Sequence, residues 1–107
     1  MPKLIDIFEA KIYESKAAFF VDSEDTYIPC ADKATADLAA KCLRANSNSP
    51  EDIYVRSANE VPNAAKDHVA SKQVLTKSWI DRAMADADDM GEKEAYVGNL
   101  IIDMYED

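Results

Sequence analysis

Residues 79–107 read WIDRAMADADDMGEKEAYVGNLIIDMYED and contain the clearest periodic pattern in the chain. In the second half of this stretch, apolar residues recur with a period of about 3.6, which is typical of an amphipathic helix with a wide apolar stripe. The stripe consists of Tyr96, Val97, Leu100, Ile101, Met104 and Tyr105. We expect these side chains to belong to the core. Gly98 lies inside the stripe, where a glycine costs about 1 kcal/mol relative to alanine, and a close approach of another backbone would explain it.

A second helical pattern precedes this one. It is weakly amphipathic from about residue 64 and sharpens from residue 75. Its apolar positions are Leu75, Trp79, Ile80, Ala83, Met84 and Ala87, with Trp79 expected in the core. Ser78 and Asp81 have the spacing of a capping box, which allows the helix to start again there. We expect the helix to end at residues 88–91, with Gly91 in the left-handed position that follows a helix end.

The first thirty residues predict three extended segments. Residues 4–13 alternate in polarity like a half-buried strand, although Leu4, Ile5, Phe8 and Ile12 also share a helical face. Residues 17–21 and 26–30 are predicted as the second and third strands, joined by a polar turn into an antiparallel meander. Pro29 has no N–H group, so the third strand is expected to lie at a sheet edge or to end there.

A helix and a further strand follow. Asp32 is a good N-cap residue for the alanine-rich segment KATADLAAKCLRA. The predicted apolar stripe of this helix is Ala34, Leu38, Cys42 and Ala45, with Leu43 beside it. Residues 53–57 (IYVRS) are β-branched and aromatic, as in a strand. The strand–helix–strand order is compatible with a parallel crossover or with a helix that crosses one face of a mixed sheet.

These segments predict a single α+β domain over residues 1–107. Its sheet is small, mainly antiparallel and of about four strands, with two to three helices on one face, in the order β-β-β-α-β-α-α. Cys30 and Cys42 are predicted to lie too far apart for a disulfide, as free thiols in a reducing cytoplasm. The N-terminal residues do not resemble a signal peptide, and no apolar run has membrane-spanning length.

Negative charge is concentrated near the C-terminus. The chain has a net charge of −9, and residues 81–107 hold nine acids against two bases. Residues 1–80 hold twelve acids against ten bases. A rigid array of carboxylates suits a basic protein groove, whereas the alternative is a solvated helix face. The predicted partner-binding residues are Asp81, Asp86, Asp88, Asp89, Glu92, Glu94, Asp103 and Glu106.

Catalytic and cofactor motifs are not supported by the sequence. Residues 86–97 match part of a calcium-binding loop, but Met90 and Val97 stand where ligands belong. His68, the only histidine, is expected at the surface. Two glycines are too few for the common phosphate-binding loops, and the bases are too dispersed for a nucleic-acid patch. We therefore expect no metal, no cofactor, no enzymatic activity, and no direct nucleic-acid or membrane binding.

The expected function is non-enzymatic binding. An acidic protein of this size would dock on a basic protein surface, such as the nucleic-acid channel of an enzyme or effector complex. Its carboxylates would act there as a DNA mimic. Phage inhibitors such as anti-restriction and anti-CRISPR proteins work in this way as a class, which is an analogy of size and charge alone. The alternatives are an immunity protein or antitoxin, a small enzyme or ligand-binding domain that uses a cleft between the sheet and the last helices, and a homo-oligomeric structural protein. Tyr27, Tyr54 and Tyr105 would either face a partner or cap the core.

Overall fold

The strands form one antiparallel sheet in the order β2-β1-β3. The computed structural model describes residues 17–23, 26–89 and 91–106. The strands are β1 (Phe19–Ser23), β2 (Thr26–Cys30) and β3 (Ile53–Ser57). The helices are α1 (Lys33–Ala45), α2 (Asn63–His68), α3 (Lys77–Asp86) and α4 (Lys93–Tyr105), with short 3-10 helices η2 (Pro50–Asp52) and η3 (Ala58–Glu60). The α+β class is confirmed. Three of the expected strands are present, and the predicted strand 4–13 lies outside the described residues.

Strand β1 is the centre of the sheet. It pairs with β2 in a register that places Val21 opposite Ile28, and with β3 in a register that places Val21 opposite Val55. Because β2 and β3 are both antiparallel to β1, they run in the same direction on its two sides. Helix α1 therefore connects two parallel strands that are not neighbours, and it crosses one face of the sheet.

Strand β2 lies at an edge of the sheet, as Pro29 predicted. The outward carbonyl of Pro29 accepts a hydrogen bond from the N–H of Leu75 at 2.8 Å, and the N–H of Ala31 donates to the carbonyl of Leu75 at 2.9 Å. This single bridge holds residue 75 in an extended conformation beside β2. It also explains why the helix predicted from about residue 64 is broken into two shorter helices, α2 and α3.

Helix α3 begins two residues before the predicted restart. Its N-cap is Thr76, whose hydroxyl accepts a hydrogen bond from the N–H of Trp79 at 3.2 Å. The capping box predicted from Ser78 is therefore wrong, because Ser78 is already inside the helix. The helix ends at Asp86 with Ala87 as its C-cap. Gly91 lies too far beyond this end to be the left-handed residue that terminates it.

Asp32 is the N-cap of helix α1, as predicted. The carboxylate of Asp32 accepts from the Thr35 hydroxyl at 2.7 Å and from the Thr35 N–H at 2.8 Å, and these bonds lower the pKa of Asp32. The predicted apolar stripe is wrong in part, since Ala34 and Ala45 are exposed. The buried residues are Thr35, Ala36, Ala39, Ala40, Cys42 and Leu43. They cover a broader face because α1 contacts both the sheet and α4.

Helix α4 packs closely on α1. A Cβ atom at Gly98 would overlap the carbonyl oxygen of Cys42 and would lie 2.8 Å from its carbonyl carbon. This close backbone approach accounts for the glycine, and it places α4 directly against the α1 backbone. On the same helix, Val97 and Ile101 are fully buried and Tyr105 is buried.

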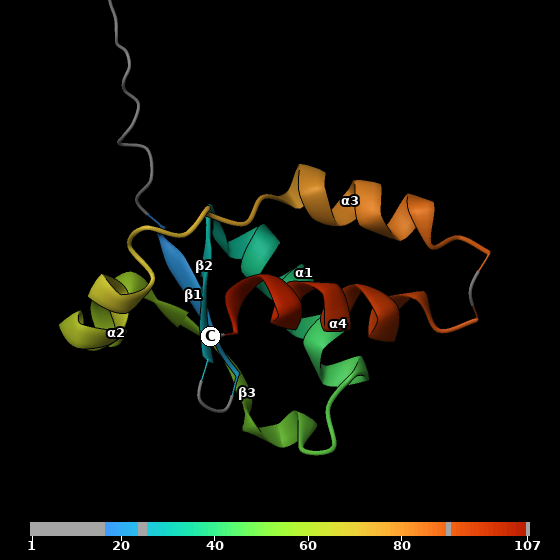
Figure 1. Cartoon of the computed structure of the whole chain (residues 1–107). Helices are drawn as coiled ribbons and strands as arrows, with labels where there is room; N and C mark the ends of the chain where they lie inside the picture. The colour runs from blue at the N-terminus through green and yellow to red at the C-terminus, as the bar shows by residue number, and fades with distance from the viewer. Residues whose placement is uncertain (1–16, 24–25, 90, 107) are drawn as a thin grey trace, which may run out of the picture.

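The helices lie on both sides of the sheet. Figure 1 shows α1, α3 and α4 on one side and α2 on the other. Val21 and Ile28 face the main core under α1, whereas Phe20 faces a second, smaller cluster with Val61 and Val69. The expected placement of helices on one face therefore holds for α1 and α4, with α3 packed against them, but not for α2.

Candidate functional site

The candidate site is the corner at which α3 ends and α4 begins. Six of the eight predicted acids occur here, on the last turns of α3, in the connection, and in the first turn of α4. They are Asp81, Asp86, Asp88, Asp89, Glu92 and Glu94. Five of them are exposed and Glu94 is half-buried. Helices α3 and α4, on either side of this connection, contact each other.

Two of these carboxylates form ion pairs. Lys77 Nζ lies 2.7 Å from Asp81 Oδ2, one helical turn away, and Lys93 Nζ lies 3.5 Å from Asp88 Oδ1. The side chains of both pairs are well exposed to solvent, where such pairs contribute little to stability. Among the residues that the structure describes, the other four acids of the corner are in no ion pair. Their charge is available to a partner.

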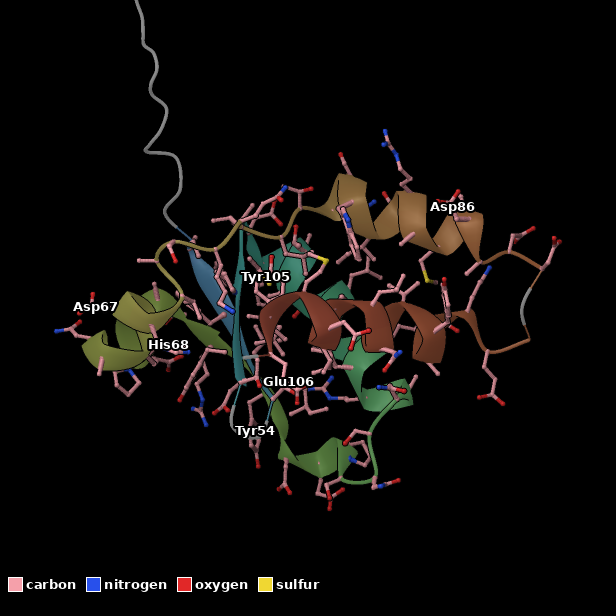
Figure 2. All side chains as sticks on the ribbon, in the orientation of Figure 1. Tyr54, Asp67, His68, Asp86, Tyr105 and Glu106 are labelled. Carbon is pink, nitrogen blue, oxygen red and sulfur yellow. The ribbon has the colours of Figure 1, made fainter. Side chains whose placement is uncertain are left out.

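Asp103 and Glu106 lie away from the corner. They are near the C-terminal end of α4, about 14 Å and about 18 Å along the helix axis from Glu94 in its first turn. Figure 2 shows this separation, with Asp86 at the end of α3 and Glu106 beside the sheet. The eight predicted acids therefore do not form one surface. The eight acids were predicted as one group because they are close in sequence. Helix α4 places Asp103 and Glu106 at its far end, away from the other six.

The α4 stripe that was expected in the core is only half buried. Val97, Ile101 and Tyr105 are buried, whereas Tyr96 is 40% exposed and Met104 is 39% exposed. Trp79, also expected in the core, is only partly buried against it. The prediction failed because the stripe is wider than the face that α1 covers. The width of the stripe in the sequence was the observation from which its partial exposure to solvent could have been predicted.

A narrow groove runs between α3 and α4 next to this stripe. It has a volume of about 170 Å³ and is lined by Trp79, Arg82, Ala83, Asp86, Tyr96 and Leu100. It was not predicted from the sequence, because no local pattern specifies how two consecutive helices pack. Asp86 belongs to both the groove and the acidic corner, so the two features form one continuous surface.

A larger hollow lies at the other end of α4. It has a volume of about 440 Å³ and is lined by Thr26, Tyr27, Ala65, His68, Val69, Tyr105 and Glu106. The hollow lies between β2, α2 and the end of α4. His68 is exposed, as predicted, at the end of α2. The hydroxyl of Tyr105 donates to the carbonyl of Gln73 at 2.5 Å, and burial raises the pKa of this phenol. Tyr105 is therefore a structural residue in this wall.

Strands β1 and β3 carry a further polar surface, formed by Asp22, Tyr54 and Arg56. Arg56 Nε donates to Asp22 Oδ2 at 2.9 Å, which raises the pKa of Arg56. Its guanidinium lies 5.1 Å from the centre of the Tyr54 ring. Tyr54 is 48% exposed, whereas Tyr27 is only partly exposed. Asp22 and Arg56 form an ion pair that neutralises both charges. This surface therefore presents less unpaired charge than the acidic corner does.

The two thiols are buried and free. Burial and the nearby charge of Asp32 raise the pKa of Cys30 to about 12. Burial likewise raises the pKa of Cys42. A nucleophilic cysteine needs a lowered pKa and access to substrate. Neither thiol therefore has the environment of a catalytic nucleophile.

Metal-binding geometry is absent from residues 17–23, 26–89 and 91–106, since no three side chains of the usual ligand types converge there. Met90, which interrupts the calcium-like loop, lies outside the described residues. None of the helices in the described part has the length and apolar character to cross a membrane.

No protein-family model, no curated protein and no solved structure matches the chain. Its function is therefore inferred from the site itself.

Proposed function

We propose that this protein is a non-enzymatic binding protein that docks its acidic corner on a basic protein surface and inhibits that partner. The observation that carries the proposal is the gathering of six carboxylates at one helix–helix corner. The nucleic-acid channel of an enzyme or effector complex is the kind of surface that fits, because it is built to bind closely spaced phosphates.

Electrostatics supports this proposal in two ways. The net charge of −9 would speed the encounter with a basic partner and disfavour encounters with nucleic acid or anionic lipid. Three of the six carboxylates, those of Asp81, Asp86 and Glu94, also lie on helices, so their backbone loses little conformational freedom on binding. A cytoplasmic partner is part of the proposal, since two free buried thiols suit a reducing compartment.

The test is affinity capture on three immobilised forms of the protein. The first is the wild type. The second carries lysine at four acids of the corner, namely Asp86, Asp88, Asp89 and Glu92. The third carries lysine at four exposed acids on other elements, namely Asp37, Glu51, Asp52 and Asp67. The two variants have the same net charge, so they separate an effect of position from an effect of total charge.

We expect basic proteins to be retained by the wild type and by the control variant but lost from the corner variant. Retained proteins should be released as salt rises from about 50 mM to about 500 mM, because screening weakens exposed charge pairs. The same proteins on all three columns, or retention that is independent of salt, would disprove docking by the corner. If the retained protein is a co-encoded toxin, the partner is that of an immunity protein or antitoxin rather than a nucleic-acid enzyme.

A further inference from the structure

Helix α4 presents an apolar stripe toward solvent on the side that faces α3. Tyr96, Leu100 and Met104 follow one another at intervals of four residues, so they lie in one row along the helix. Tyr96 and Met104 are two of the three large apolar side chains that are exposed in the described part of the chain, the third being Tyr54 on the sheet. Two such side chains in one row are more than the isolated exposed residues that any protein surface has.

The groove beside this row is the right size for a side chain of a partner protein. Its volume of about 170 Å³ is below the roughly 300–1,000 Å³ of typical small-molecule pockets. Trp79 and Ala83 of α3 form one wall, and Tyr96 and Leu100 of α4 form the other. A groove of this size accepts one apolar anchor of an amphipathic helix, and the neighbouring anchors, at intervals of three and four residues, would lie along the row of exposed side chains.

The charges around the groove determine which helix would bind. Asp86 lies in its wall, and Asp103 is on the same side of α4 as Tyr96, two turns further along. Residues 79–103 hold seven acids against two bases, one of which, Arg82, lines the groove. A second copy of this chain would bring the same negative charge to the surface and be repelled. A partner with lysine or arginine beside its apolar row would be attracted.

We propose that the α3–α4 groove binds a basic amphipathic helix of the partner protein. The inference rests on the proposed function, because it names the structural form of the basic surface that the corner meets. An apolar side chain of the partner helix enters between Trp79 and Tyr96. The basic residues that flank it pair with Asp86 and Asp103, and the acidic corner steers the encounter.

The test uses Trp79 as an internal probe, since it is the only tryptophan of the chain. The ligand is a leucine–lysine peptide of about 18 residues, long enough for five helical turns, with leucine repeated at helical spacing. A scrambled peptide of the same composition keeps the charge but has no apolar face. We expect the amphipathic peptide to shift Trp79 emission to shorter wavelength and to bind at least about tenfold more tightly than the scrambled one.

Three variants give this experiment its controls. Tyr96→Ser with Met104→Ser removes two exposed members of the row and should weaken binding of the amphipathic peptide by about tenfold or more. Tyr54→Ser removes an exposed tyrosine on another surface and should leave binding unchanged. The triple variant Asp88→Lys, Asp89→Lys, Glu92→Lys removes negative charge from the corner without changing a residue that lines the groove. It should weaken binding of both peptides.

The outcomes separate the two proposals. Equal binding of the two peptides with no change in Trp79 emission overturns the groove proposal and leaves the acidic corner in place. Undiminished binding by the Asp88, Asp89 and Glu92 variant overturns the charge proposal and leaves the groove in place. Sedimentation that shows a dimer, abolished by the Tyr96 and Met104 substitutions, assigns the groove to a second copy and overturns the helix partner.

Discussion

The two sides of helix α4 differ in how closely they are packed. On the α1 side, Gly98 brings the helix into contact with the backbone at Cys42, and Ile101 is fully buried. On the α3 side, Tyr96 remains 40% exposed above a groove. A single helix therefore stabilises the fold with one side and leaves apolar surface available with the other. If this comparison is right, stability depends on the α1 side and binding depends on the α3 side.

The largest expected effect is the alkaline instability of the buried core. The pKa of Cys30 is raised from 9.0 to about 12 in the fold, so the protonated thiol stabilises the native state below pH 9. This stability is lost as pH rises toward 12, by about 1.4 kcal/mol per pH unit and about 4 kcal/mol in total. Urea unfolding at several pH values above 9 measures this slope. The Cys30→Ala variant should show a smaller slope, and an equal slope would assign the loss to other groups.

Truncation of one buried side chain on α4 should have the next largest effect. Ile101→Ala removes a fully buried side chain and should lower the free energy of unfolding by about 3–4 kcal/mol. Leu100→Ala, on the neighbouring half-buried position, should cost no more than about 1.5 kcal/mol. Chemical denaturation of the two variants compares the two sides of the helix directly. Equal losses would mean that the α3 side is packed as tightly as the α1 side.

A methyl group at Gly98 should also destabilise the protein. Its Cβ would overlap the carbonyl oxygen of Cys42, so α4 must move away from α1. We expect Gly98→Ala to cost about 2–3 kcal/mol, even though alanine favours helix formation. Gly91→Ala is the matched control, because its Cβ would meet no atom within 4 Å and the change should stay within about 0.5 kcal/mol. A neutral Gly98→Ala variant, as measured by thermal or urea unfolding, would refute the close helix contact.

The smallest expected loss of stability concerns the start of α3, the helix that lies on the less closely packed side of α4. Thr76→Ala removes the N-cap hydroxyl and should cost about 1 kcal/mol. Thr76→Ser keeps the hydroxyl and should restore most of that loss. Ser78→Ala should leave the free energy of unfolding nearly unchanged. A larger loss for Ser78→Ala than for Thr76→Ala would show that Ser78 is the N-cap, as the sequence pattern predicted. The change in unfolding midpoint in urea ranks the three variants.

The comparison also explains which sequence predictions succeeded. Local chemistry determines the strands at residues 26–30 and 53–57, the cap at Asp32 and the last helix, α4, and the structure contains all of them. The edge position of Pro29 follows from its missing N–H group. The break between α2 and α3 was missed because it depends on Leu75, whose backbone bonds with β2 come from a strand more than forty residues earlier.

The sequence by itself determined the α+β class and the concentration of negative charge after residue 80. Both follow from periodicity and composition, which are properties of the chain alone. Only the tertiary structure decided which half of the α4 stripe is buried, because that depends on where α1 and α3 lie. It also decided that six acids share a corner while Asp103 and Glu106 lie at the other end of a rigid helix.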